Sequence, residues 1–211
     1  MSFKLICFDM DGVIFKYSNF WLELHKKLGT FEQGKELTEK HLHTDYDKLV
    51  EEVVERLWKG KDAGPYYELV ESLEYLPGVK ETFEHVKKRG YITAIISASS
   101  IDVARRVQRD FGVDHVFANE LIIRDGKISG EFAWPIGAGK EKKAEIIKSL
   151  CQGLGISTKE VIYIGDSDID IEAFKEVGLS VAFNSDSGDL KKAASYVVQT
   201  SNLSDVIKHI P

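Results

Sequence analysis

The chain has 211 residues, of which 43% are hydrophobic, so it can bury a real core and fits one ordinary domain or one domain with a small insert. Its formal net charge of -6 argues against nucleic acid as the main partner, because binding to a phosphate backbone needs a clustered excess of Lys and Arg. The first apolar stretch is too short for a signal peptide and no run approaches a membrane-spanning length, so we expect no membrane partner. Cys7 and Cys151 make no disulfide framework and have no metal-ligand spacing, which favours a reducing, cytoplasmic setting.

The N-terminal part of the chain predicts one strand followed by a helical block. Phe3 to Phe8 is a short, mostly apolar run that ends at two acids and Gly12, as expected of a buried strand that leads into a tight loop. From about Lys16 to Tyr75, apolar residues recur at helical spacing among charged ones. Pro77 and Gly78 then end this all-helical block.

Beyond the block, apolar runs alternate with amphipathic stretches. We predict, in order, a helix over Val79–Arg89 stopped by Gly90, a strand over Tyr91–Ile96, a helix over Asp102–Phe111, a strand over Val116–Ala118, a hairpin that turns at the Asp-Gly of LIIRDGKISG, a helix over Lys142–Leu150, a strand over Val161–Ile164, a helix over Ile171–Glu176 and a strand over Leu179–Phe183. This alternation favours an α/β class with a Rossmann-like parallel sheet and helices on both of its faces. We expect residues 1–15 and 77–211 to form this core, with residues 16–76 as a small all-helical cap inserted after the first strand.

Polar residues follow three of these strands at their carboxyl ends, where an open parallel sheet binds its ligands. The first strand ends in Asp9-Met10-Asp11-Gly12, the second in Ser97, and a late one in Gly165-Asp166-Ser167-Asp168-Ile169-Asp170. If these strands are neighbours, several carboxylates converge on one crevice and repel one another. Mg²⁺ prefers hard oxygen ligands of this kind together with water and phosphate, so we expect Mg²⁺ as the cofactor.

The spacing of Asp9 and Asp11 has a mechanical consequence. In an extended segment, residues two apart point to the same side, so one carboxylate can attack phosphorus while the other handles a proton. Gly12 permits a sharp turn with backbone amides near the phosphate. Taken singly, each feature also has a simpler interpretation: an Asx turn for Asp-x-Asp-Gly, helix capping for the late acids, and a loop or capping role for Ser97. Their co-occurrence at three strand ends favours the functional interpretation.

Four segments that span residues 8–170 form a set: FDMDGV, the Ser97 that ends TAIIS, a Lys in the helix GKEKKAEII, and IGDSDID. This set resembles the four motifs of haloacid dehalogenase superfamily phosphatases. Within that superfamily, the stretch GYITAIISASSIDVARRVQRDFGVDHVFANELIIRDGKISGEF is similar to the phosphoserine phosphatase group, including its hairpin after FAN. The chain length and the position of the helical insert match that group as well.

The resemblance implies roles for the matching residues. Asp9 would be the nucleophile that forms an aspartyl-phosphate, and Asp11 would first protonate the leaving oxygen and then activate water. Mg²⁺ would be held by the Asp9 side chain, the Asp11 main-chain carbonyl and Asp166, while Asp170 would orient the Lys or a metal-bound water. The phosphoryl group would be bound by Ser97, Ala98, Gly12 and Lys143. Such positioning and cationic stabilisation suit a phosphoryl group that carries charge on three oxygens.

The catalytic Lys has three adjacent candidates, Lys140, Lys142 and Lys143. Most lysines on such a helix are simply solvated. Register with Ala144-Glu145-Ile146-Ile147 selects Lys143, with Lys140 in reserve.

Several positions depart from the phosphoserine phosphatase pattern and leave recognition of serine open. Gly12-Val13 stands where that group has Ser-Thr, Ala98 where it has Gly, and Ile169 where it has Asn. That group also uses a Glu and an Arg of the cap to grip the amino and carboxylate groups of serine. The matching positions here hold Ser18-Asn19 and Val53-Val54, although Glu23 and Arg56 lie in nearby turns.

Aromatic residues are frequent in the helical block, among them Trp21, Tyr46 and Trp58. At helical spacing, aromatics more often form a packing face between cap and core than line a pocket, so we expect packing. His41 and His43 have no third ligand at a sensible spacing, and we expect ordinary surface or capping residues there.

The leading functional hypothesis is a phosphoric monoester hydrolase that acts on a small phosphorylated metabolite under a closing cap, as a monomer or homodimer. A phosphomutase of the same fold is an alternative, as is a phosphatase for a phosphorylated sugar, glycolate or nucleotide. A receiver domain that is phosphorylated on a strand-end Asp shares the parallel α/β organisation, but it has no large insert after the first strand. A non-catalytic binding protein should lack one of the motif acids, and none is missing here.

Overall fold

A computed structural model describes residues 2–16, 19–42, 44–137 and 140–211 of the chain. Its sheet has seven strands in the order β4-β3-β2-β1-β5-β6-β7. In chain order they are β1 (Leu5–Phe8), β2 (Ile92–Ser100), β3 (His115–Arg124), β4 (Lys127–Ala133), β5 (Val161–Gly165), β6 (Leu179–Phe183) and β7 (Tyr196–Val198). All neighbouring strands are parallel except β3 and β4. The α/β class with a mostly parallel sheet is therefore confirmed.

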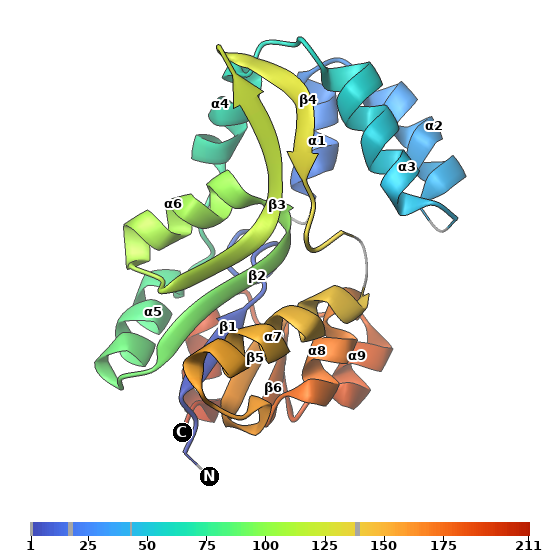
Figure 1. Cartoon of the computed structure of the whole chain (residues 1–211). Helices are drawn as coiled ribbons and strands as arrows, with labels where there is room; N and C mark the ends of the chain where they lie inside the picture. The colour runs from blue at the N-terminus through green and yellow to red at the C-terminus, as the bar shows by residue number, and fades with distance from the viewer. Residues whose placement is uncertain (1, 17–18, 43, 138–139) are drawn as a thin grey trace.

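Helices cover both faces of the sheet (Figure 1). One face carries α5 (Val79–Lys88), α6 (Ile101–Phe111) and the 3-10 helix η4 (Leu203–His209), and the other carries α7 (Lys140–Leu154), α8 (Ile171–Glu176) and α9 (Gly188–Ala193). Successive residues of the central strand β1 point to opposite faces. Ile6 and Phe8 accordingly belong to one hydrophobic cluster, and Leu5 and Cys7 belong to the other. Burial on both faces explains why β1 is an uninterrupted apolar run.

The segment between β1 and α5 folds into a helical block, which consists of α1 (Phe20–Lys27), α2 (Phe31–His41), α3 (Tyr46–Glu51), the π-helix η1 (Glu52–Trp58) and α4 (Gly64–Ser72). The β3–β4 hairpin leaves the sheet and reaches this block (Figure 1). There the backbone N–H groups of Gly60 and Ala63 donate to the carbonyls of Ile128 and Gly126, each at 2.8 Å. The block is thus attached to the sheet by backbone hydrogen bonds as well as by its two chain connections.

Two features of the core differ from the sequence-based expectation. The strand expected to end at Ile96 continues through Ser97 to Ser100, whose Oγ accepts the Asp102 N–H at 3.2 Å and begins α6. The elements α9, β7 and η4 near the C-terminus have no counterpart in the prediction. β7 is only three residues long, with Tyr196 and Val197 exposed, so its short Tyr-Val-Val run gives too weak a signal for a buried strand. Within the described ranges, no helix is both long enough and apolar enough to cross a membrane.

Candidate active site

The acids that end strands meet at one edge of the sheet. β1 lies between β2 and β5, and Phe8 pairs with Ile95 on one side and Ile164 on the other. The residues that follow are therefore neighbours, and the Asp9 N–H donates to the Ile164 carbonyl at 2.9 Å. One pocket of about 300 Å³ is lined by Asp9, Asp11, Ser97, Ala98, Lys143 and Asp166. Six side chains from four separate segments thus share a single pocket.

Lys143 lies at the base of this pocket, with a side chain only 1% exposed. Its Nζ lies 2.6 Å from Asp9 Oδ2 and 2.7 Å from Asp170 Oδ1. Burial lowers the pKa of Lys143, but the two carboxylates more than offset this effect and raise the pKa above its usual value, so the side chain stays charged. Lys142 instead pairs on the surface with Glu145. The side chain of Lys140 lies outside the described part of the structure.

Asp170 is fully buried, and each of its carboxylate oxygens accepts two hydrogen bonds. Oδ1 accepts from Lys143 and from the Tyr163 hydroxyl at 2.9 Å, while Oδ2 accepts the N–H groups of Asp166 and Ser167 at 3.1 and 3.2 Å. These bonds fix the loop that carries Asp166 and the direction of the Lys143 side chain. Asp170 is therefore arranged as a support for the other residues.

The remaining carboxyls of the site are poorly compensated by protein groups. Burial is the largest cause that raises the pKa of Asp9 to about 6, of Asp11 to about 7 and of Asp166 to about 8. The charge of Asp9 adds to this effect for both Asp11 and Asp166. Among the side chains that the structure describes, only Lys143 brings a positive charge into the pocket. The site therefore holds more carboxyl groups than its single cation can keep ionised.

This donor set fits a divalent cation. One carboxylate oxygen from each of Asp9, Asp166 and Asp170 lies within 4.8 Å of the others. Each Asp170 oxygen already accepts two hydrogen bonds, whereas each Asp9 oxygen accepts one, from Met10 or Lys143, so Asp9 and Asp166 are the acids with remaining ligand capacity. Closely spaced carboxylates with a few remaining positions for water and phosphate are the environment in which Mg²⁺ binds. The geometry is thus compatible with the predicted metal site.

Gly12 makes the sharp turn that was expected of it. Its φ is +76°, and a Cβ at this position would lie 2.1 Å from Asp166 Oδ2, so only glycine allows the loop after β1 to approach Asp166 this closely. Its N–H donates to the Phe15 carbonyl at 3.0 Å. The Gly12 amide thus donates within the loop, and binding of phosphate at Gly12 stays a prediction.

The end of β2 supplies hydroxyl groups to the pocket. Ser97 is buried, and its Oγ accepts the Ser99 N–H at 3.2 Å. Ser99 also lines the pocket and lies near enough to Asp11 to lower the pKa of that carboxyl. Nevertheless Ser99 Oγ is buried and makes no hydrogen bond of normal geometry within the described part of the chain. A buried hydroxyl without a partner in a pocket is a ready donor for a ligand.

Sequence reasoning missed Ser99 and Asn119, and it gave Trp21 only a packing role. The signal for Ser99 was its spacing of two from Ser97, which places both residues on one face once the strand is extended to Ser100. Asn119 donates to the Ala98 carbonyl at 2.9 Å and accepts the N–H of Ile136 at 3.1 Å, so it ties β2 to the segment before α7. The Trp21 Nε1–H donates to the same Ala98 carbonyl, also at 2.9 Å. No local pattern in the sequence announces either of these long-range bonds.

Some of the helical-block residues named in the sequence analysis lie at the pocket and others do not. Asn19 lines the pocket, whereas Glu23 and Arg56 are absent from the described residues that line it. His41 is the last residue of α2, which agrees with the expected capping position, but it is only 6% exposed and its Nε2 has no partner in the described ranges, so the alternative of a surface residue was wrong. Its helix packs against α3 and η1, which covers the ring. Ser18 and His43 lie outside the described residues.

Comparisons with known proteins agree with this geometry. A family model for haloacid dehalogenase-like hydrolases matches residues 3–178. The phosphoserine phosphatase of Methanocaldococcus jannaschii is 26% identical over 209 residues, which cover 98% of this chain and 97% of the relative. That of Archaeoglobus fulgidus is 30% identical over 202 residues, 95% of this chain and 58% of the relative.

Solved structures show the same similarity in three dimensions. A substrate-bound phosphoserine phosphatase complex superposes over 100% of both chains with a TM-score of 0.84 at 25% identity. A structure described as a phospho-aspartyl intermediate analogue of phosphoserine phosphatase gives a TM-score of 0.83 at 26% identity, again over both whole chains. The chain therefore belongs to the haloacid dehalogenase-like hydrolase family, in which it is a phosphoric monoester hydrolase similar to the phosphoserine phosphatases.

Proposed function

We propose that the chain hydrolyses a small phosphomonoester through an aspartyl-phosphate on Asp9. The observation that carries this proposal is the Asp9 carboxylate itself, which is buried at the end of β1, paired with Lys143 at 2.6 Å, and shares a pocket with Asp11. A carboxylate held in this way is a competent nucleophile towards phosphorus, and Lys143 offsets the negative charge of both the nucleophile and the phosphoryl group.

The reaction has two steps, and its protons balance through Asp11. In the first, an Asp9 carboxylate oxygen bonds to phosphorus, the bond from phosphorus to the alcohol oxygen breaks, and the Asp11 carboxyl gives its proton to that oxygen. In the second, Asp11 takes a proton from water, the water oxygen bonds to phosphorus, and the phosphorus–Asp9 bond breaks. Ser97 is placed to donate to a phosphoryl oxygen beside Lys143. Inorganic phosphate and the free alcohol are the products.

Mg²⁺ suits the same pocket. We assign its ligands to the side chains of Asp9 and Asp166 and the main-chain carbonyl of Asp11, with Asp170 holding Asp166 and Lys143 in position. When bound, the cation supplies positive charge that stabilises the negative phosphoryl oxygens. The excess of carboxylates over the single Lys143 cation supports this assignment.

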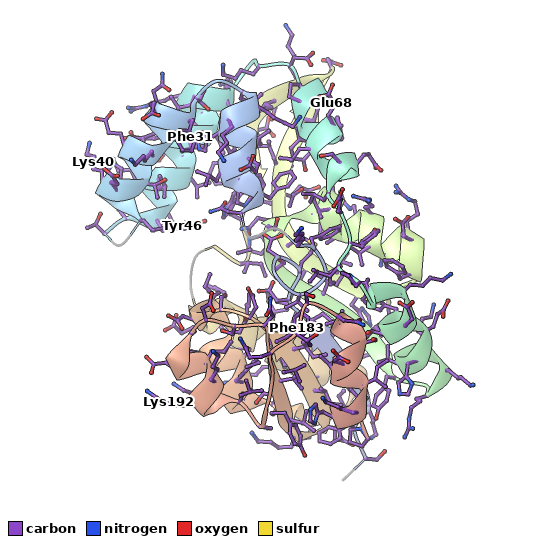
Figure 2. All side chains as sticks on the ribbon, turned by 180° about the vertical axis from the view of Figure 1, so that it is seen from behind. Phe31, Lys40, Tyr46, Glu68, Phe183 and Lys192 are labelled. Atoms are coloured by element: carbon purple, nitrogen blue, oxygen red, sulfur yellow. The ribbon has the colours of Figure 1, made fainter. Side chains whose placement is uncertain are left out.

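The helical block has the position of a cap. We assign residues 16–76 to this cap and residues 1–15 and 77–211 to the catalytic core. Trp21 and Tyr46 of the block line the same pocket as Asp9, so the block closes the site opposite the strand ends. Figure 2 labels Tyr46 at the end of the block that faces the core. Exclusion of bulk water there would protect the aspartyl-phosphate from uncontrolled hydrolysis.

Trapping of the intermediate tests the proposal. The enzyme is mixed with ³²P-labelled p-nitrophenyl phosphate and Mg²⁺, quenched in acid, and examined for label on the protein that hydroxylamine removes. We expect label on the parent enzyme, none on Asp9→Asn, and a loss of turnover in that variant of at least about a thousandfold. Asp11→Asn should slow both steps by a factor on the order of 100. EDTA should stop turnover, and added Mg²⁺ should restore it.

Asp168→Asn is the matched control, because Asp168 belongs to the same acidic segment but is exposed and accepts a hydrogen bond from Ser187. This variant should keep both its label and its turnover. Substantial turnover by Asp9→Asn would remove Asp9 from the nucleophile role. Full activity in EDTA would show that turnover needs no metal ion.

A further inference from the structure

The catalytic pocket continues into a second cavity inside the helical block. This inner cavity has a volume of about 190 Å³ and is lined by residues of α1, α2, α3 and η1 together with Trp134. Asn19, Trp21, Leu42 and Tyr46 line both the inner cavity and the catalytic pocket, so the two spaces adjoin along these side chains. A group attached to a phosphate at Asp9 therefore lies next to the inner cavity.

Aromatic rings form much of the wall of the inner cavity. The ring centroid of Trp21 lies 4.5 Å from that of Trp134 and 6.1 Å from that of Trp58. The polar edges of these rings are already satisfied: Trp21 donates to Ala98, Trp134 donates to the Tyr46 hydroxyl at 3.0 Å, and Trp58 donates to Thr30 at 3.2 Å. The ring surface left for a ligand is consequently apolar. For the aromatics of the helical block we expected packing alone. That expectation was incomplete, because Trp21, Tyr46 and Trp58 also border open space.

No formal charge faces the inner cavity from the described residues that line it. His25 is the one titratable base in this wall, and burial lowers its pKa to about 4, so it is neutral at physiological pH. Glu23 instead forms an ion pair with Lys26 at 2.5 Å. Arg56 has a side chain 73% exposed and faces Glu52 at 3.7 Å. A substrate such as phosphoserine would bring an ammonium and a carboxylate to a wall that offers neither of them a partner, which is costly.

We propose that the phosphomonoester has an uncharged, apolar leaving group, an aryl-substituted alcohol being the best fit, which occupies the inner cavity. This inference rests on the proposed phosphomonoesterase activity and names its substrate class. The available space is sufficient, because an apolar cavity of roughly 150 Å³ already accommodates benzene. Trp21 and Trp134 pack against each other and border this cavity, so contact with them adds to the burial of the aryl group.

Three alkyl phosphates with comparable reacting centres test the substrate class. 2-Phenylethyl phosphate and phosphoethanolamine share a two-carbon link and differ in a phenyl ring against an ammonium, and phosphoserine adds a carboxylate to the latter. Because all three leaving groups are alkanols, differences in kcat/KM report binding of the remainder and not leaving-group acidity. We expect kcat/KM for 2-phenylethyl phosphate to exceed that of either charged substrate at least tenfold. An equal or higher value for phosphoserine would overturn the inference.

A charge placed at the junction of the two spaces provides a second measurement. Leu42 is 36% exposed and lines both, so Leu42→Arg puts a cation beside the path to the inner cavity without removing a fully buried side chain. The preference for 2-phenylethyl phosphate over phosphoserine should fall at least tenfold. Tyr67→Arg is the control, because Tyr67 is 47% exposed on α4 and borders neither space. An unchanged preference in a folded Leu42→Arg variant would contradict the inference.

The outcomes also separate this inference from the proposed function. If phosphoserine is the preferred substrate and label still appears on Asp9, the inference fails while the proposed function stands. If phosphate is released neither from the three alkyl esters nor from p-nitrophenyl phosphate, the inference and the proposed function fail together. Thermal unfolding of each variant shows whether a lost preference reflects loss of the fold.

Discussion

The two halves of the active site are built on opposite principles. On the core side, Asp9, Lys143 and Asp170 form a chain of buried charges joined by bonds of 2.6 and 2.7 Å. On the side of the helical block, Trp21 and Trp134 present rings to a cavity without formal charge on its described walls. The proposed phosphoryl transfer thus relies on the core, and the proposed selection of the leaving group relies on the block.

The halves also differ in how their residues are positioned. Each acid of the core follows a parallel strand whose register is fixed by its neighbours on both sides. The block instead consists of short helices, one of them the π-helix η1, and π-helical turns occur frequently at functional sites. The block reaches β2 through the hydrogen bond that Trp21 donates to the Ala98 carbonyl. Within one fold, the reaction can thus be kept while the block is changed to suit another substrate.

The largest effect on stability is expected from removal of the buried cation. Lys143→Met leaves Asp9 and Asp170 without their shared partner and should destabilise the fold by about 3–5 kcal/mol. Turnover should fall by about 10²- to 10³-fold because charge compensation at the phosphoryl group is lost. Urea unfolding and steady-state phosphate release measure the two effects. Lys142→Met, at the neighbouring surface ion pair, should change the free energy of unfolding by less than about 1 kcal/mol.

A double variant separates stability from catalysis. Adding Asp170→Asn to Lys143→Met removes one of the two uncompensated carboxylates, so the double variant should recover part of the lost stability. Its turnover should stay low, since nothing replaces the cation. Recovery of turnover along with stability would mean that Lys143 only maintains the fold.

The same contrast explains what could be predicted from the sequence. The strand-end acids are local signals, and one apolar run followed by Asp-x-Asp-Gly was enough to place Asp9 and Asp11 at the sheet edge. The helical register that selected Lys143 is equally local, and the structure brings that side chain to Asp9. The bonds that Asn119 makes to Ala98 and Ile136 join residues 21 and 17 positions apart, and no periodicity encodes them.

The inner cavity was beyond prediction for a related reason. Trp21, Trp58 and Trp134 come from separate segments, and only the packing of α1, η1 and the segment after β4 decides whether their rings meet or leave space. Helical spacing shows that such residues are buried, but it does not show against what. The long β3–β4 hairpin was expected as a hairpin, yet its contact with the block depends on how far it extends from the sheet.

Acidification should weaken the apolar half through His25. Its ring packs on Trp58 with centroids 4.6 Å apart, and Nδ1 lies 2.8 Å from Thr30 Oγ1. Burial lowers the pKa of His25 from 6.5 to about 4. The unfolded chain therefore binds a proton near pH 6.5 that the folded chain resists, so stability is full above that pH and is lost as pH falls towards 4. The loss attributable to His25 should reach about 3 kcal/mol.

Unfolding free energies measured between pH 8 and pH 4 test this expectation. His25→Gln should be less stable at pH 8, because it loses ring packing, but the difference from the parent should shrink as pH falls. His209→Gln serves as a control in the core, where the ring stacks on Tyr196 and burial lowers its pKa to a smaller extent. If the unfolding free energies of the parent and His25→Gln change with pH in the same way, His25 can be protonated in the folded block at little cost. That result would weaken the contrast between the two halves.

The smallest effect concerns the hairpin tip that connects the two regions. Gly126 has φ +74° with open space around its Cβ position, and its carbonyl accepts the Ala63 N–H. Gly126→Ala should therefore cost about 1 kcal/mol through backbone strain alone. Gly153→Ala, inside α7 with the same open surroundings, should stabilise by about 0.5–1 kcal/mol.

All three tryptophans line the inner cavity, so their fluorescence reports on the block, whereas circular dichroism reports on the whole chain. The urea midpoints of the two signals show whether the regions unfold together. Because the hairpin tip is bonded to the block, Gly126→Ala should shift both midpoints equally. A shift confined to tryptophan fluorescence would mean that the helical block unfolds independently of the core. The block would then be a separately stable cap, and its cavity, whose described walls hold no formal charge, could be exchanged without cost to the charged half.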